Sequence, residues 1–217
     1  MVCLSEITHS YVENYIRSIL PDQEGLLKEM EQYANDNHVP IVHKEVAALI
    51  KVLTKSVQAK KVLEVGMAIG YSSMIFIESM GKDGHITTIE RDDKMYELAL
   101  NYIEKAGIAN QVKIIKEDAL EVLKHLEGTY DLIFLDGAKG HYNEFLEDCL
   151  RLLKKGGIII SDNILFKGMV ATDDLVTRRK RTIVNRMRDY LSYISHHPKL
   201  ETSILPIGDG VAISYKK

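Results

Sequence analysis

Cysteine is scarce in this chain, and its scarcity excludes two kinds of stabilising site. Only Cys3 and Cys149 occur among the 217 residues, one near the amino terminus and one within a helical pattern. Two such residues can form neither a disulfide framework nor a zinc site built from thiolates. We therefore expect the protein to work in the reducing cytoplasm.

Long apolar runs are also missing. Among the first twenty residues, Glu6, Glu13 and Arg17 interrupt the uniform apolar stretch that a signal peptide or a membrane-spanning helix needs. Hydrophobic residues make up 46% of the chain and charged residues 27%, as in ordinary globular proteins. The eight histidines show no spacing typical of metal ligands. We expect one compact domain without membrane association.

Prolines are few, so the organisation of the chain is read from apolar periodicity. Short β-branched runs have the length of buried strands, at residues 61–65, 86–90, 112–116, 132–136 and 158–162. Helical patterns separate them. The clearest spans Met95 to Ala106, with Asp92 or Asp93 as N-cap and Gly107 after its end. This alternation predicts a doubly wound, Rossmann-like α/β fold with a mainly parallel sheet.

The two ends of the chain depart from the alternation. Residues 10–20, 23–35 and 44–56 have helical patterns, so we expect an N-terminal helical extension over residues 1–58, packed on a core of residues 59–217. Near the carboxyl end, a helix around residues 183–194 precedes strand-like runs at 201–205 and 211–215. The turn Gly208-Asp209-Gly210 separates these runs and can join antiparallel strands. We therefore expect about seven strands, the last of them antiparallel.

The loop after the first strand limits the choice of ligand. In Gly66-x-Ala68-x-Gly70, a dinucleotide fingerprint would also require glycine at positions 68 and 71. No P-loop sequence is present either. Glu90 and Asp118 follow the second and third strands, where carboxylates can accept from the ribose hydroxyls and the adenine amino group of a nucleoside. The alternative is that both carboxylates only cap the following helices.

Oxygen-bearing side chains end the next two strands. Asp136 closes the fourth strand, and Asp162 and Asn163 close the fifth. At one edge of a parallel sheet these carboxylates repel each other unless a cation lies between them. The set suits Mg²⁺, with Ca²⁺ and Mn²⁺ as alternatives. Lys139 lies above this edge, where its neutral amine can take a proton from a hydroxyl. Singly, these residue types are common as helix caps and solvated side chains.

The chain from Val62 to Gly168 resembles the small metal-dependent O-methyltransferases of the catechol and caffeoyl-CoA type. The resemblance lies in VLEVGMAIGYSS, in Glu90, in FLDGAKGHY, in GGIIISDNILFKG and in the later LPIGDG. It implies in-line methyl transfer from S-adenosylmethionine to a metal-bound hydroxyl that has a second oxygen beside it. FLDGAKGHY departs from the commoner Asp-Ala-Asp-Lys form at Gly137 and Ala138, which bears on substrate preference.

The resemblance also implies roles for individual residues. The metal ligands would be Asp136, Asp162 and Asn163. Lys139 would be the general base, acting beside Asp136. Glu90 would bind the ribose, and Val42 would contact the methionine part of the cofactor. The full cofactor pocket would contain Val42, Glu64, Gly66, Ala68, Gly70, Ser72, Glu90, Asp118, Ala119 and Asp136.

Positive charge is concentrated in one segment, although the net charge of the chain is -3. Residues 177–188 contain no acidic residue. This basic segment contains Arg178, Arg179, Lys180, Arg181, Arg186 and Arg188. Such a cluster can hold several phosphates of an RNA. The alternative is the solvated face of a helix whose apolar stripe includes Ile183 and Met187.

Taken as a whole, the chain resembles the bacterial tRNA 5-hydroxyuridine methyltransferases of this family, which methylate the wobble uridine to 5-methoxyuridine. The 5-hydroxyl and 4-carbonyl oxygens of 5-hydroxyuracil are neighbours and can chelate one cation, as a catechol does. A single-stranded anticodon base avoids the cost of opening a duplex. The resemblance thus implies tRNA as the substrate and a homodimer. Two alternatives stay open: a methyltransferase of small catechols or phenylpropanoids, and a noncatalytic nucleotide-binding partner protein.

Overall fold

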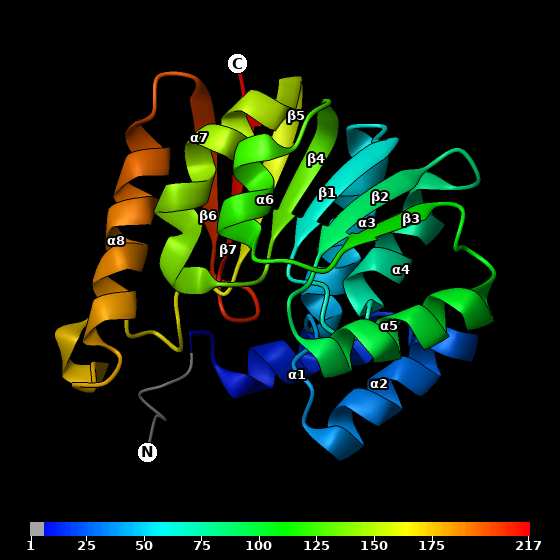
Figure 1. Cartoon of the computed structure of the whole chain (residues 1–217). Helices are drawn as coiled ribbons and strands as arrows, with labels where there is room; N and C mark the ends of the chain where they lie inside the picture. The colour runs from blue at the N-terminus through cyan, green and yellow to red at the C-terminus, as the bar shows by residue number, and fades with distance from the viewer. Residues whose placement is uncertain (1–6) are drawn as a thin grey trace.

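Seven strands form one mixed sheet in the order β3-β2-β1-β4-β5-β7-β6, as Figure 1 shows for this computed structural model. The structure describes residues 7–217, so Cys3 and Glu6 lie outside the described residues. The strands are β1 (Lys61–Val65), β2 (His85–Ile89), β3 (Val112–Ile115), β4 (Tyr130–Leu135), β5 (Leu153–Asp162), β6 (Leu200–Leu205) and β7 (Val211–Lys216).

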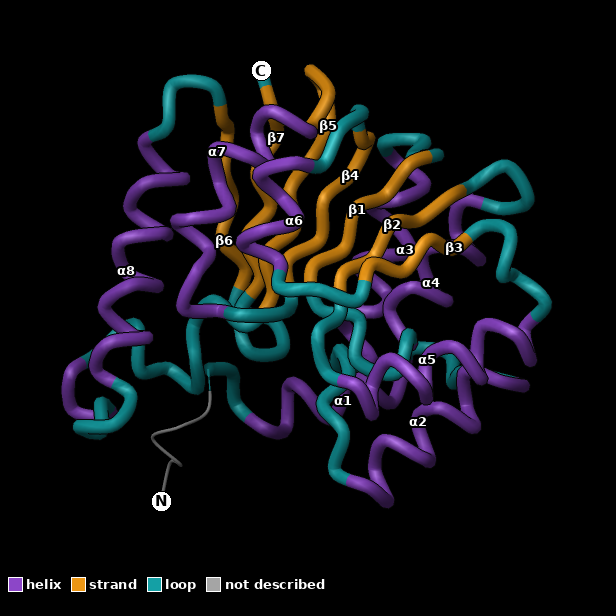
Figure 2. Tube along the Cα trace, in the orientation of Figure 1, coloured by secondary structure: helices purple, strands orange, loops and turns teal. Residues whose placement is uncertain are grey.

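Strand direction follows the predicted pattern. The pairs β1–β2, β2–β3, β1–β4 and β4–β5 are parallel, whereas β7 runs antiparallel to both β5 and β6. The predicted mainly parallel, Rossmann-like sheet with an antiparallel last strand is therefore confirmed. The turn at Gly208-Asp209-Gly210 joins β6 to β7, and Figure 2 shows it as one of the loops gathered at a single edge of the sheet.

Helices cover both faces of the sheet. They are α1 (Ser10–Ile19), α2 (Gly25–Asn37), α3 (Lys44–Ser56), α4 (Tyr71–Met80), α5 (Asp93–Ala106), α6 (Ala119–His125), α7 (Tyr142–Leu152) and α8 (Arg181–His196), with short 3₁₀ turns η1 (Lys139–His141) and η2 (Asp173–Leu175). The α5 boundaries match the sequence signals: the Asp92 side chain accepts from the Met95 N–H, and Gly107 ends the helix in a left-handed conformation.

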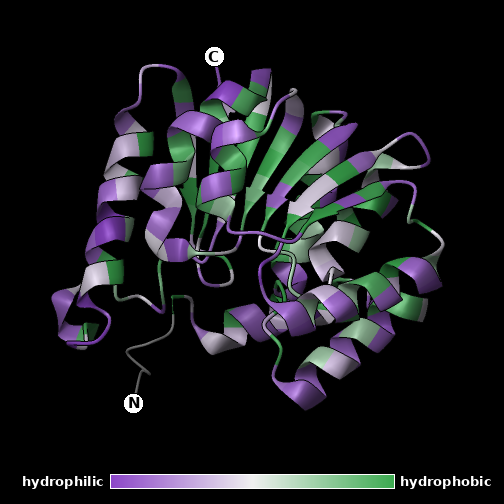
Figure 3. Cartoon of the chain, in the orientation of Figure 1, coloured by the Kyte–Doolittle hydropathy of each residue, from purple (hydrophilic) through white to green (hydrophobic). Residues whose placement is uncertain are grey.

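Two hydrophobic cores lie on opposite sides of the sheet because neighbouring strand residues point to opposite faces. Val62 and Phe134 pack with α2, α3 and α4, whereas Leu63 and Ile133 pack with α6, α7 and α8. Figure 3 shows the strands as a hydrophobic layer inside helices with polar outer faces. No helix of residues 7–217 is long and apolar enough to cross a bilayer.

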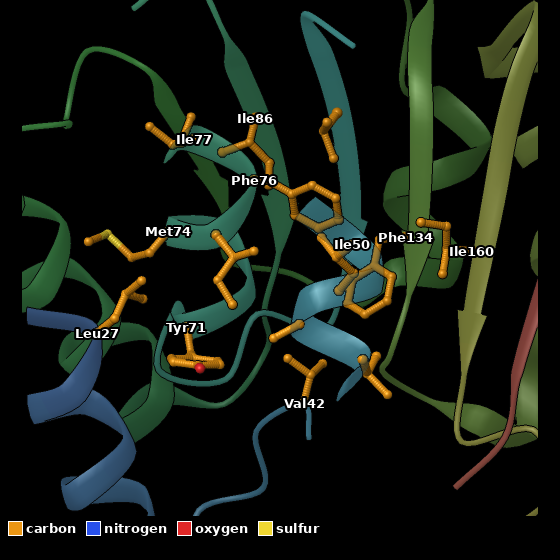
Figure 4. Packing of buried hydrophobic residues seen from close by; sticks show 14 of the residues in the cluster. Leu27, Val42, Ile50, Tyr71, Met74, Phe76, Ile77, Ile86, Phe134 and Ile160 are labelled. Carbon is orange, nitrogen blue, oxygen red and sulfur yellow. The ribbon is translucent and has the colours of Figure 1, made fainter. Parts of the chain in front are cut away.

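The N-terminal helices are part of the first core. Leu27 of α2 and Ile50 of α3 are buried in the same cluster as Phe76 and Phe134, and Figure 4 shows Ile50 beside these two rings. The ring centroids of Phe76 and Phe134 are 5.5 Å apart in an edge-to-face arrangement. Helices α2 and α3 thus share this core with the sheet and pack against α4, and α1 packs against α3.

Candidate active site

A cavity of about 690 Å³ opens where β1, β4 and β5 end. Its wall combines the loops after these strands with the turn between β6 and β7 and with residues of the N-terminal extension. Among the predicted site residues, those that line it are Val42, Gly66, Ala68, Ser72, Glu90, Asp136, Lys139, Asp162 and Asn163. The structure thus brings nine separate predictions together in one space.

Close contact between two loops shapes the floor of the cavity. Gly66 has φ +92°, and a Cβ atom there would lie 2.6 Å from both Cα and N of Gly137. Gly137 is equally restricted, since its own Cβ would lie 2.8 Å from Cα of Gly66. Both positions therefore require glycine. Gly70, with φ +86°, begins α4, so its contribution is to the turn.

Glu64 lies behind the cavity wall. It is fully buried and accepts hydrogen bonds from the hydroxyls of Ser72, Ser73 and Thr88. Burial raises the pKa of this carboxyl group, although the three hydroxyl donors oppose the shift. Since Ser72 also lines the cavity, Glu64 supports the loop from beneath and holds the amino end of α4 in place.

Glu90 reaches the cavity and ties two loops together. Its Oε2 accepts from the Ala68 N–H at 2.9 Å, and its Oε1 accepts from the N–H groups of Arg91 and Asp92 at 2.9 and 2.8 Å. Carboxylate oxygens have further lone pairs for a ligand hydroxyl. A nucleoside-binding role therefore fits the observed position.

Asp118 is placed differently. Its side chain caps α6 by accepting from the Leu120 N–H at 2.9 Å, and it pairs with Arg91 at 3.0 Å. Neither Asp118 nor Ala119 is among the residues lining the cavity. The helix-capping alternative accounts for the contacts of Asp118, and its contact with an adenine stays a prediction.

Two neighbouring carboxylates lie at the ends of β4 and β5: Asp162 is buried, whereas the Asp136 side chain is 21% exposed. Burial raises the pKa of Asp136 well above its ordinary range, and the charge of Asp162 raises it further. Burial also raises the pKa of Asp162 to about 6, although the Asn163 N–H donates to its carboxylate. Within residues 7–217, no hydrogen bond to the Asp136 carboxylate is found, and Lys139 Nζ lies 4.0 Å away.

Lys139 and Asn163 complete this cluster. Lys139 Nζ donates to Asn163 Oδ1, and Asn163 adopts a left-handed conformation with φ +56°. The part of the chain that the structure describes has no group of three His, Cys, Asp or Glu residues suited to a metal. The cluster instead offers two carboxylates and one amide oxygen, a hard donor set that fits a cation such as Mg²⁺.

Several cavity residues were not found from the sequence. Arg17 of α1 forms a two-point hydrogen bond with Glu45, at 2.8 and 2.7 Å. The Tyr71 hydroxyl donates to Glu31 of α2 at 2.5 Å, and burial raises its pKa. His43, Lys167 and Asp209 complete this group. Asp209 had a visible signal in its two flanking glycines, whereas Arg17 and His43 reach the cavity only through packing of the extension.

Comparison with known proteins agrees with this geometry. A model of the O-methyltransferase family matches residues 17–217. This chain belongs to that family. A caffeoyl-CoA O-methyltransferase from Populus kitakamiensis is 30% identical over 223 residues, covering 96% of this chain and 93% of the relative.

Solved structures show the same fold as this O-methyltransferase. The crystal structure of a candidate caffeoyl-CoA O-methyltransferase from Staphylococcus aureus is 37% identical, with a TM-score of 0.89 over 96% of this chain and 100% of the other. An O-methyltransferase from Bacillus cereus in complex with SAH has a TM-score of 0.83 at 24% identity, over 95% of this chain and 97% of the other.

The basic segment of this O-methyltransferase divides into two groups. Arg178, Arg179, Lys180 and Arg181 are exposed. Arg186 donates to the Gly140 carbonyl at 3.1 Å. Arg188 donates to the carbonyls of Met169 and Val170 and pairs with Asp173 at 2.7 Å. The first four residues thus have exposed charges, while Arg186 and Arg188 are engaged in holding neighbouring loops.

Proposed function

We propose that this O-methyltransferase moves the methyl group of S-adenosylmethionine to a hydroxyl that has a second oxygen beside it, with the help of Mg²⁺. The observation that carries the proposal is the cluster of Asp136, Lys139, Asp162 and Asn163 in the same cavity as the Gly66 loop. Family membership supplies the reaction type. The residues that line the cavity are the candidates for each role in that reaction.

The cofactor would occupy the part of the cavity lined by Gly66, Ala68, Ser72 and Glu90. Support comes from the Bacillus cereus structure, which contains SAH on the same fold. Glu90 would accept the ribose hydroxyls, and Val42 would contact the methionine part. Because Glu90 also holds the Ala68 N–H, binding of the ribose and the shape of the loop depend on one carboxylate.

Asp136, Asp162 and Asn163 would hold the Mg²⁺, whose positive charge would lower the pKa of the acceptor hydroxyl. Two neighbouring carboxylates with raised pKa values favour binding of a cation at this position, because the cation removes their repulsion. Lys139 would take the hydroxyl proton and orient the acceptor, since its Nζ lies between Asp136 and Asn163.

For the acceptor we propose 5-hydroxyuridine at the wobble position of tRNA. The exposed residues Arg178, Arg179, Lys180 and Arg181 support this choice, because they lead into α8, which begins at Arg181 and packs against η1, the turn that carries Lys139. Four exposed cations in one segment can bind the phosphates that flank a target nucleotide. The neighbouring oxygens of 5-hydroxyuracil meet the same chelating requirement as a catechol.

A small phenol is the second candidate acceptor, and the Populus kitakamiensis relative favours it. One experiment separates the two. Nucleosides from the tRNA of a deletion strain should contain 5-hydroxyuridine in place of 5-methoxyuridine, and the purified protein should restore the methoxy form in vitro. An unchanged nucleoside profile, together with turnover of caffeoyl-CoA or a catechol, would replace the tRNA acceptor by the phenol.

Charge reversal in the basic segment should separate RNA binding from chemistry. In the triple variant Arg178→Glu, Arg179→Glu and Arg181→Glu, we expect tRNA affinity to fall about tenfold or more at moderate salt, because phosphate contacts are lost. Methylation of a small catechol should change less than about twofold. The matched control reverses Lys82, Lys113 and Lys199, which are exposed at the opposite edge of the sheet. Equal loss of tRNA binding in both triple variants would contradict a local RNA site.

Stabilisation by Mg²⁺ should increase with pH. A carboxyl with a raised pKa keeps its proton to higher pH in the folded protein than in the unfolded chain, so without metal the free energy of unfolding falls as the pH rises through about 6. Mg²⁺ must displace the same protons. We therefore expect a larger Mg²⁺-induced rise in Tm at pH 7.5 than at pH 5.5, and a lost pH dependence in Asp162→Asn. Identical Tm shifts at both pH values would argue against these ligands.

A further inference from the structure

Residues 163–168, here called the ligand loop, follow β5 and contain three residues in an unusual backbone conformation. Asn163, Phe166 and Lys167 have φ values of +56°, +47° and +55°. Residues other than glycine seldom adopt this region, and they do so when the surrounding structure holds them there. Asn163 and Lys167 both line the cavity. The loop therefore needs an anchor that keeps these two side chains in place.

The turn between β6 and β7 supplies that anchor. The Asp209 carboxylate accepts from the Lys167 N–H at 2.5 Å, and its carbonyl accepts from the Leu165 N–H at 3.0 Å. The Gly210 carbonyl accepts from the Ile164 N–H at 3.1 Å. In Figure 1 this turn (red) lies at the same edge of the sheet as the end of β5 (yellow). Three hydrogen bonds, from residues 164, 165 and 167, thus hold the ligand loop against the turn.

Packing makes the contact between turn and loop tight. A Cβ atom at Gly210, whose φ is +86°, would lie 2.4 Å from Cγ of Leu165. Gly208, with φ +54°, leaves room for Val46 and His43 of the N-terminal extension. The two glycines therefore place Asp209 between the ligand loop and the extension, and explain why an acidic residue flanked by glycines occurs in this turn.

Asp209 holds the ligand loop itself, and α8 holds the two residues that follow it. Arg188 donates to the carbonyls of Met169 and Val170, directly after the ligand loop. The hydrogen bond between Asp209 and Lys167 lies nearer to Asn163 along the chain than those of Arg188 do. Lys167 itself lines the cavity. Half-burial of the Asp209 carboxylate also means that water competes less for the Lys167 N–H.

We propose that Asp209 is a positioning residue that fixes the ligand loop and thereby holds Asn163 and Lys167 in the active-site cavity. The expected effect of Asp209 on metal binding rests on the proposed function. The loop-fixing part stands on the hydrogen bonds alone. Asp209 acts through the backbone of Lys167, so an acceptor atom at the same place should preserve much of its effect.

Three variants test the role. Asp209→Ala removes the acceptor, and Asp209→Val is a second variant without a side-chain acceptor in case the first does not fold. Asp209→Asn retains an oxygen that can accept from the Lys167 N–H. The matched control for the change of charge is Asp131→Asn, because Asp131 also accepts from backbone N–H groups, those of Lys60 and Lys61, and its carboxylate pairs with Lys154 at 2.6 Å at the opposite edge of the sheet.

Two measurements report on the variants: Mn²⁺ affinity by electron paramagnetic resonance, and hydrogen exchange of the amides at 164–167. We expect Asp209→Ala to bind Mn²⁺ about tenfold more weakly or worse, as is usual when an outer-shell partner of a metal site is removed. Its loop amides should exchange faster. Asp209→Asn should stay within about threefold of the wild type, and Asp131→Asn should lower Tm without changing Mn²⁺ affinity.

The outcomes distinguish this inference from the proposed function. Loop amides that exchange at the wild-type rate in Asp209→Ala and Asp209→Val would overturn the positioning role, whether or not metal binds. Wild-type affinity for Mn²⁺ in these variants would overturn it as well. A wild-type protein that binds no Mn²⁺ would contradict the proposed metal site, and the exchange rates would then decide the role of Asp209 by themselves.

Discussion

Asp162→Ala is expected to reduce methyl transfer by about 10³-fold, while the protein stays folded and still binds S-adenosylmethionine. The side chain lies at the end of β5, opposite Asp136, and provides one of the two charges that would hold the metal. Loss of the several kcal/mol of charge stabilisation that a catalytic cation provides corresponds to a rate factor of this size.

The measurement is single-turnover transfer of a labelled methyl group at saturating cofactor, with cofactor affinity measured separately by calorimetry. Asp131→Asn again serves as the control, because it changes an anchoring carboxylate away from the cavity. Since burial raises the pKa of Asp162, removal of this carboxyl should raise the stability of the metal-free protein above pH 6. Undiminished biological activity of Asp162→Ala would instead favour a noncatalytic binding protein.

Gly66→Ala should have the largest effect on the fold. The added Cβ would meet backbone atoms of Gly137 at 2.6 Å, and φ +92° is itself unfavourable for alanine. Backbone atoms on both sides leave no flexible side chain to give way. We expect a loss of about 4 kcal/mol or more in the free energy of unfolding, hence a fall in Tm of about 10 °C.

A second glycine provides the matched control. Gly128 has φ +102°, close to that of Gly66, but no atom lies within 4 Å of a Cβ built there. Gly128→Ala therefore carries the conformational cost without the steric one. The difference in Tm between the two variants, measured with and without cofactor, gives the effect of the contact with Gly137. Equal Tm values for the two variants would show that the contact with Gly137 is unimportant.

Strands and helices could be predicted from the sequence because each depends on local pattern. The buried runs of β1, β4 and β5 and the capped helix α5 carry their signals within a few residues. The positions of Glu90, Asp136 and Asp162 followed from the same pattern, since ligands of this fold bind where parallel strands end. The local sequence pattern, together with the rule that ligands bind where parallel strands end, was sufficient to predict the positions of these residues.

Tertiary packing decided the remaining residues, and no local pattern encodes it. Arg17 reaches the cavity because α1 lies against α3, where Glu45 accepts its hydrogen bonds. Arg188 belongs to the basic segment in sequence, yet its guanidinium serves the loop beside it. Glu64 belongs to the cofactor motif in sequence but lies beneath the loop. A sequence pattern gives the residue type and the face of the helix or strand on which the residue lies. Which residue it contacts depends on how the rest of the fold packs around it.

The contact between Gly66 and Gly137 has a thermodynamic consequence. The loop proposed to bind the methyl donor touches, backbone to backbone, the loop that carries Asp136 and Lys139. A shift of either loop must be shared by the other, because no side chain lies between them to absorb it. Occupation of one half of the cavity should therefore change the affinity of the other half, and by the same factor in both directions. The methyl donor and the proposed metal would then bind as a reciprocally coupled pair.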